Sequence, residues 1–157
     1  IEEAASQRNG LLKIKTVGDA YMATAGMMDA LENPVQACVD AGLEMIEAAQ
    51  FLPDRWTLRV GVHVGPVISG AVGTQQKFFD IWGDTVNVAA RVQGHGSPAM
   101  VTVSEACMPA IEQRYTGVQR REVEAKGAGP LVVFDIPLQG TAGAQVAPRG
   151  VVRQSSP

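Results

Sequence analysis

The sequence predicts an α+β fold with an antiparallel sheet. Three observations lead to this prediction: two short strands follow one another over residues 11–25, an amphipathic helix comes next, and further strands follow the helix. This order of strand, strand, helix and strand is typical of α+β folds and differs from the strict alternation of a doubly wound parallel sheet.

The first half of the chain begins with a helical segment, residues 1–8, which the pair Asn9-Gly10 ends. Alternation predicts a strand over 11–15 with Lys13 and Lys15 on one face, and a second strand over 20–25 follows a tight turn at Gly18-Asp19. Asn33 is placed to cap a helix that begins at Pro34 and ends before Pro53, with Gln36 as its capping-box partner. One apolar stripe of this helix is expected to pack on a core: Val35, Cys38, Val39, Gly42, Ile46 and Ala49.

The second half of the chain consists mainly of strands. Alternation predicts a half-buried strand over 58–64, after which 67–72 either pairs back or continues, and a short strand follows over 78–82. Asp84 is expected to cap a helix over 85–92, and Ser104, after a strand over 100–103, to cap another. Strands over 120–123 and 131–136 close the fold. We expect residues 1–139 to form the domain and 140–157 a flexible tail.

The composition excludes several classes of protein. Of 157 residues, 46% are hydrophobic and 18% charged, which indicates a folded domain with a sizeable core. The net charge of -3 argues against a nucleic-acid partner bound through a basic surface. No apolar run approaches the roughly 18 residues of a membrane span. Cys38 and Cys107 lack CxxC partners, so we expect reduced thiols and a cytoplasmic location.

The first candidate site is the segment from Lys15 to Asp19, which combines a cation on a strand with a carboxylate at a hairpin tip. Such a carboxylate is suited to Mg²⁺, which takes one or two protein carboxylates together with phosphates. Taken alone, Asp19 is explained at least as well by the preference of Asp for turns.

The second candidate site lies over residues 79–91. Asn87 and Arg91 are four residues apart on a predicted helix, so an amide and a guanidinium project from one face and can hold a ribose and a phosphate. A solvated surface pair is the alternative. Asp80 stands between Phe79 and Ile81, and a carboxylate inside an apolar strand requires a hydrogen-bonding partner.

The third candidate is Lys126, which lies in a loop of small residues and can reach a phosphate as a mobile charge. The loop lacks the GxxxxGK[ST] spacing of a P-loop, so an ordinary connecting loop is the alternative.

Together and in this order, the segments IKTVGDAYM, RVGVHVGPVISGAVG, FFDIWGDTVNVAAR and EAKGAG resemble the catalytic domain of class III nucleotidyl cyclases. The resemblance extends to Ile136. It implies a ferredoxin-like cyclase fold derived from a βαββαβ core, and a homodimer with active sites across its interface.

The resemblance also implies the residues that read the base. Lys15 and Asp80 match the purine-selecting pair of adenylyl cyclases, where guanylyl cyclases typically carry Glu and Cys. A Lys ammonium can donate to adenine N1, and an Asp carboxylate can accept from the adenine amino group. Guanine reverses these two edges, so the pair favours ATP over GTP.

The remaining site residues follow from the same resemblance. Asp19 matches one of two carboxylates that hold two Mg²⁺ or Mn²⁺ ions. Asn87 and Arg91 match the residues that position the ribose and stabilise the transition state, and Lys126 matches the lysine that binds the triphosphate. Ala128 stands where relatives often carry a second Lys, which is expected to weaken triphosphate binding slightly.

The sequence departs from the family at its beginning. The first metal-binding Asp of the family lies on a strand upstream of the helix that here begins at Ile1, and no Asp precedes Asp19. The domain therefore looks N-terminally truncated, with one metal carboxylate where the mechanism requires two. We expect a parent adenylyl cyclase with an upstream sensor or membrane region, and little or no activity from the 157-residue chain alone.

The leading prediction is an adenylyl cyclase that converts ATP to 3′,5′-cyclic AMP and pyrophosphate. Two alternatives stay open. One is a catalytically inactive dimerisation or regulatory module on the same fold, and the other is a guanylyl cyclase.

Overall fold

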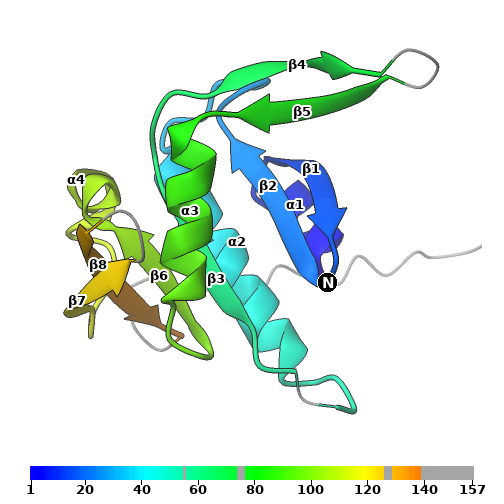
Figure 1. The fold of residues 1–157 in the computed structure, drawn as a ribbon. Helices are drawn as coiled ribbons and strands as arrows, with labels where there is room; N and C mark the ends of the chain where they lie inside the picture. Colours follow the sequence, from blue (N-terminus) through cyan, green and yellow to red (C-terminus); the bar gives the residue numbers. More distant parts are fainter. Residues whose placement is uncertain (55, 74–76, 126–128, 139–157) are drawn as a thin grey trace, which may run out of the picture.

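The structure, a computed structural model, describes residues 1–54, 56–73, 77–125 and 129–138. The elements appear along the chain (Figure 1) in the order α1 (Glu2–Arg8), β1 (Leu11–Val17), β2 (Ala20–Ala25), α2 (Pro34–Ala49), β3 (Arg59–Val62), β4 (Ile68–Val72), β5 (Phe78–Trp82), α3 (Asp84–Gly94), β6 (Met100–Ser104), the short 3-10 helix η1 (Glu105–Cys107), α4 (Met108–Ile111), β7 (Gln119–Ala125) and β8 (Gly129–Pro137).

The strands form three sheets. The largest has the order β3-β6-β8-β7, and the hairpins β1-β2 and β4-β5 are separate two-stranded sheets. All pairs are antiparallel except β3-β6. That pair is parallel because the chain leaves β3 through the β4-β5 hairpin and α3 before it enters β6 in the same direction. The predicted antiparallel sheet is therefore confirmed with this one exception.

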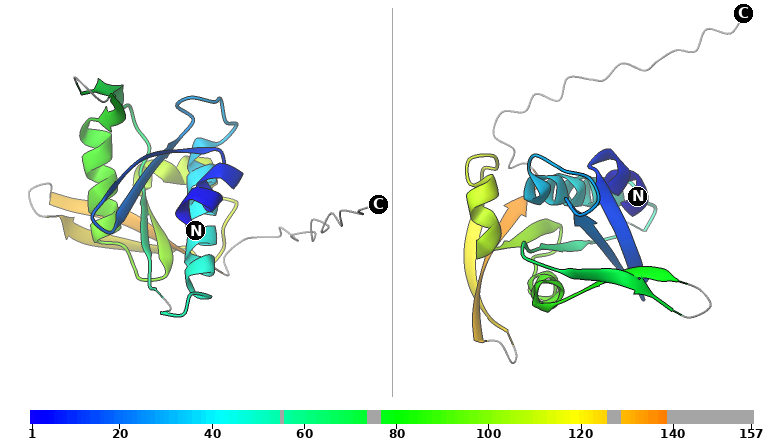
Figure 2. Two further views of the ribbon diagram at one scale, coloured as in Figure 1. Left: turned by 90° about the vertical axis from the view of Figure 1, so that its right-hand side faces the viewer. Right: turned by 90° about the horizontal axis from the view of Figure 1, so that it is seen from above.

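Helices α2 and α3 pack on opposite faces of the β3-β6 pair (Figure 2). The predicted apolar stripe of α2 is confirmed, since Val39 and Ile46 are buried in the main core with residues of β3, β6 and β8. Gly42 brings the helix close to the sheet: a Cβ there would lie 2.9 Å from side-chain carbons of both Val60 and Val101.

On the other face, α3 approaches the backbone of β3 directly. A Cβ on Gly61 would lie 2.6 Å from Gln93 Cβ and closer still to the Gln93 backbone. A Cβ on Gly65 would lie 2.6 Å from Thr85 Oγ1 near the start of the helix. The glycines of the segment RVGVHVGPV therefore set the distance between α3 and the sheet.

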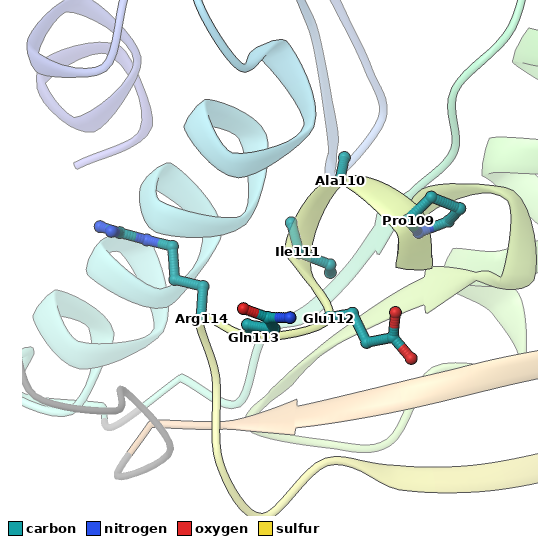
Figure 3. A pocket seen from close by; sticks show the side chains of 6 residues that line it. All are labelled: Pro109, Ala110, Ile111, Glu112, Gln113 and Arg114. Atoms are coloured by element: carbon teal, nitrogen blue, oxygen red, sulfur yellow. The ribbon is translucent and has the colours of Figure 1, made fainter.

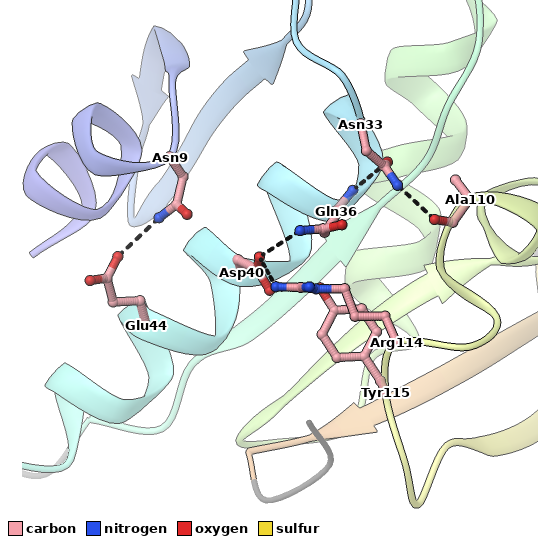
Figure 4. A network of polar contacts seen from close by, with 8 residues as sticks. All are labelled: Asn9, Asn33, Gln36, Asp40, Glu44, Ala110, Arg114 and Tyr115. Carbon is pink, nitrogen blue, oxygen red and sulfur yellow. Dashed lines mark hydrogen bonds and ion pairs between the residues drawn. The ribbon is translucent and has the colours of Figure 1, made fainter. Parts of the chain in front are cut away.

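Polar contacts join α2 to α1 through Glu44 and to the segment around α4 through Asn33 and Asp40 (Figure 4). Asp40 accepts hydrogen bonds from the Tyr115 hydroxyl at 2.7 Å and from Arg114 Nη2 at 3.3 Å. Asn33 Oδ1 accepts from Gln36 N at 3.0 Å, so the predicted cap of α2 is confirmed. The Gln36 side chain does not complete a capping box, because it lies beside Asp40 and Arg114.

One predicted helix cap is wrong, and a second lacks its side-chain hydrogen bond. Helix α3 begins at Asp84 itself, and its N-cap is Gly83, whose φ of 129° suits glycine. Ser104 occupies the N-cap position of η1, as predicted, but its side chain makes no capping bond, because its hydroxyl lies 2.6 Å from His63 Nδ1 instead. His63 is thus a structural residue, and burial lowers its pKa although the charge of Asp84 partly opposes this.

Strand boundaries differ modestly from the predictions. The strand predicted over 58–64 is Arg59–Val62, and residues 67–72 pair back, since Ile68–Val72 forms a hairpin with Phe78–Trp82. The predicted tail over 140–157 lies outside the described residues. Cys38 and Cys107 are free thiols, as predicted, and none of the described helices is long and apolar enough to cross a bilayer.

Candidate active site

The structure brings Lys15 and Asp80 together. Lys15 Nζ lies 2.6 Å from Asp80 Oδ2, although one residue belongs to β1 and the other to β5. The second carboxylate oxygen, Oδ1, accepts a hydrogen bond from Ile81 N at 2.8 Å. The hydrogen bond from Lys15, followed by that from Ile81, holds the pKa of Asp80 below its usual range. The hydrogen-bonding partner that Asp80 was predicted to require is therefore Lys15.

A bulge in β1 aims Lys15 at Asp80. The register shifts between Lys13 and Lys15, so that Lys13 is opposite Ala23 and Lys15 is opposite Met22. Adjacent residues of β2 point to opposite faces, and the two lysines therefore do so as well. The prediction that they share a face is wrong: Lys13 Nζ lies over the Tyr21 ring, 5.7 Å from its centroid.

Asp19 occupies the two-residue turn between β1 and β2, as predicted, with Gly18 at a φ of 60°. Its side chain is exposed. No group of three His, Cys, Asp or Glu side chains suited to a metal ion occurs among the described residues. One carboxylate on a turn fits a single protein ligand of a Mg²⁺ ion held mainly by phosphates, but it does not form a two-ion site.

Asn87 and Arg91 lie one turn apart on α3, where Asn87 is exposed and Arg91 is half-buried. Within the described ranges, neither side chain has a hydrogen-bond or ion-pair partner, whereas Thr85 near the start of the same helix donates to Pro66 O at 2.6 Å. An amide and a guanidinium without protein partners are able to bind a polar ligand.

Strand β5 connects the two parts of the candidate site. It contacts β1, which carries Lys15, and it leads through Gly83 directly into α3. No hydrogen bond in the described part of the chain links Asp19 with Asn87 or Arg91. Lys126 and its loop lie outside the described residues.

The Lys15–Asp80 pair is partly exposed, with 41% of the Lys15 side chain and 20% of the Asp80 side chain accessible. A shallow pocket of about 450 Å³ lies elsewhere, lined by residues 109–114 around α4 (Figure 3). A second, of about 250 Å³, lies at the base of the β1-β2 hairpin and includes Gln7 and Met28. Neither contains Lys15 or Asp80.

Sequence reasoning missed one polar centre. Asp135 lies in β8 with only 1% of its surface exposed and accepts hydrogen bonds from Arg121, Ser97 and Thr102. The sequence contains the pattern that would have identified it, a carboxylate inside an apolar strand. Asp135 stands between Phe134 and Ile136 just as Asp80 stands between apolar residues.

The chain matches a known family over most of its length. A family model described as "Adenylate and Guanylate cyclase catalytic domain" matches residues 2–137. The chain belongs to this family. It is thus a class III nucleotidyl cyclase catalytic domain, as its motifs predict.

Relatives of this cyclase domain divide between two substrates. An adenylate cyclase of Mycobacterium tuberculosis is 35% identical over 126 residues, which cover 78% of this chain and 28% of that protein. The guanylate cyclase soluble subunit beta-2 of Rattus norvegicus is 34% identical over 128 residues, which cover 78% of this chain and 19% of that protein. The chain thus spans less than a third of the length of these curated relatives.

Solved structures confirm the predicted α+β cyclase fold. The guanylate cyclase domain of RhGC from Catenaria anguillulae, in complex with GTP, has a TM-score of 0.80 at 25% identity, covering 86% of this chain and 76% of that chain. A rhodopsin-guanylyl cyclase core with converted specificity, in complex with ATPαS, has a TM-score of 0.79 at 26% identity, covering 87% and 76%.

Proposed function

We propose that this cyclase domain uses ATP and converts it to 3′,5′-cyclic AMP and pyrophosphate. The observation that carries the proposal is the pair of Lys15 and Asp80, which presents a donor and an acceptor side by side, both partly exposed. Adenine offers the complementary edge, with an acceptor at N1 and a donor at its amino group. Guanine has a donor at N1 and an acceptor at O6, so with the same placement each group would face a like partner.

The chemistry requires few protein groups. The 3′-oxygen of the ribose loses its proton and forms a bond to the α-phosphorus, and the bond from that phosphorus to the bridging oxygen breaks to release pyrophosphate. Asn87 orients the ribose, and Arg91 stabilises the charge that develops on the phosphoryl oxygens. Asp19 would be one ligand of a bound Mg²⁺ or Mn²⁺ ion, which would lower the pKa of the 3′-hydroxyl and offset charge on the triphosphate. Lys126 is proposed to bind the triphosphate.

We further propose that two copies of the domain enclose the site between them. The ladder of the β4-β5 hairpin puts Asp80, Ile68 and Phe78 on one face, since Asp80 is opposite Gly70, Ile68 opposite Trp82 and Phe78 opposite Val72. Ile68 is 70% and Phe78 65% exposed. Exposed apolar residues that surround a polar site are typical of an interaction surface. A second copy seated there would cover the base-reading pair.

The test measures cyclic nucleotide formation from ATP and from GTP by the full-length protein with Mg²⁺ or Mn²⁺, together with binding of ATPαS and GTPαS. We expect ATP to be preferred, and the double variant Lys15→Glu with Asp80→Cys to move the preference toward GTP. Lys13→Glu is the matched control, because Lys13 lies on the opposite face of β1. An unchanged base preference in the double variant would contradict the assignment of these two residues.

The alternatives correspond to other outcomes of this assay. Preference for GTP by the unmodified protein would indicate a guanylyl cyclase. The similarity to the rat guanylate cyclase subunit supports this alternative. Binding without turnover would indicate an inactive module, for which the lone carboxylate of Asp19 is the supporting observation. A cytoplasmic location with an upstream sensor or membrane region completes the proposal.

A further inference from the structure

Asp135 is a buried carboxylate with every oxygen satisfied. Arg121 approaches it with two nitrogens, Nε at 2.5 Å from Oδ2 and Nη2 at 3.1 Å from Oδ1. Thr102 donates to Oδ1 and Ser97 to Oδ2, both at 2.6 Å. Burial alone would raise the pKa of Asp135, but these hydrogen bonds and the charge of Arg121 outweigh it and hold the pKa below its usual range. The carboxylate is therefore charged at neutral pH.

The network reaches beyond the sheet to the C-terminal end of α3. Arg121 Nη2 also donates to the carbonyl oxygen of His95 at 2.9 Å, and His95 N in turn donates to the carbonyl oxygen of Arg91 at 3.0 Å. Ser97, two residues further on, is the one bonded to Asp135. The segment that follows α3 is thus fixed to β7 and β8 by two charged side chains.

The other end of α3 is fixed independently. Thr85 Oγ1 donates to the carbonyl oxygen of Pro66, and the Thr85 side chain lies directly against Gly65. With the Gln93 backbone close against Gly61 and hydrogen bonds at both ends, the helix has little freedom to slide along β3. Arg91 lies one turn from the end that Arg121 holds.

We propose that Arg121 and Asp135 are positioning residues for Arg91. Sheet pairing already joins β6, β8 and β7, since Thr102 is opposite Asp135 and Arg121 opposite Val133 in the ladders. The bonds to His95 and Ser97 add a constraint on the helix that carries Arg91. The inference rests on the proposed function, in which the Arg91 guanidinium meets the phosphoryl group. The position of the guanidinium relative to the phosphoryl group depends on the position of the C-terminal end of α3.

The test uses Arg121→Lys in the full-length protein. A lysine keeps the charge beside Asp135 but lacks the fork needed to reach both Asp135 and the His95 carbonyl. We expect kcat to fall about tenfold or more, because small displacements of a catalytic group are costly, while KM stays within about twofold. The matched control is Arg114→Lys, which alters an arginine that pairs with Asp40 away from α3. A similar fall in kcat for both variants, or a rise in KM alone, would overturn the proposal.

A milder variant separates the positioning effect from a loss of folding. A second measurement separates it from a failure of the proposed function. Ser97→Ala removes one bond to Asp135 and should lower kcat less than Arg121→Lys. Hydrogen exchange of the amides at residues 92–96 should be faster in Arg121→Lys and unchanged in Arg114→Lys. If the unmodified protein forms no cyclic nucleotide, the proposed function fails, whereas unchanged exchange at 92–96 overturns the positioning of α3 whatever the activity.

Discussion

Lys15 and Asp80, 65 positions apart in the chain, meet at 2.6 Å between Nζ and Oδ2. The pair connects two hairpins that share no sheet hydrogen bonds, β1-β2 and β4-β5. The two side chains consequently form a unit, and a change to either removes the hydrogen-bonding partner of the other.

The ionisation of Asp80 should report this pairing. Because Lys15 bonds to the charged carboxylate, the pKa of Asp80 lies below its usual value of 3.8, and the stabilisation is present at neutral pH and lost as the pH falls through the lowered pKa. Lys15→Met should raise the pKa of Asp80. The measurement is carboxyl carbon NMR during acid titration, with Lys13→Met as the control. Equal titration of Asp80 in all three proteins would contradict the pairing in solution.

Arg91→Ala should lower kcat by about a hundredfold while changing KM much less, because a group that stabilises developing charge acts mainly in the transition state. The measurement is steady-state kinetics of cyclic AMP formation. Gln93→Ala, an exposed change on the same helix, should leave kcat within about twofold. A rise in KM at constant kcat would assign Arg91 to ground-state binding instead.

Gly61→Ala should destabilise the fold by about 1–3 kcal/mol or more, because the added methyl group meets the backbone of Gln93 and forces α3 away from β3. Gly94→Ala is the control, since a Cβ at Gly94 on the same helix meets no atom within 4 Å. Urea unfolding monitored by circular dichroism gives both free energies. Equal stability of the two variants would show that the close approach of helix and strand is not maintained in solution.

Phe78→Ser should weaken self-association about tenfold, because it removes an exposed aromatic side chain from the apolar face that surrounds Asp80. Sedimentation velocity over a range of concentrations measures the effect. Phe51→Ser is the control, since Phe51 is 84% exposed but lies after α2, away from the hairpin. A larger effect of Phe51→Ser would show that the interface lies near the C-terminal end of α2 and not at the hairpin.

Local patterns predicted most elements of the fold. The apolar stripe of α2, its Asn33 cap and the turn at Gly18-Asp19 depend on neighbours in sequence and were predicted correctly. The bulge that separates Lys13 from Lys15 was not, because simple alternation assumes an unbroken register. Ser104 takes the predicted N-cap position, but its missing capping bond could not be predicted locally, since His63, distant in sequence, competes for its hydroxyl.

The candidate site was predictable to the extent that its residues belong to recognisable motifs. The requirement of Asp80 for a partner follows from its apolar neighbours, but only the fold identifies that partner as Lys15. Asp135 carries the same signal and was overlooked, because its segment belongs to no motif that drew attention. Its role depends on contacts with Arg121 and Ser97, which no local pattern connects.

Under the proposed function, the existing bond between Lys15 and Asp80 affects how this pair recognises a purine. An incoming base that uses both side chains must replace an interaction already present, so its net gain is the difference between two sets of hydrogen bonds. Recognition of this kind favours modest affinity with strong discrimination, since a mismatched base would break the resident bond without forming its equivalent. An enzyme built this way would respond to changes in the nucleotide pool rather than remain saturated.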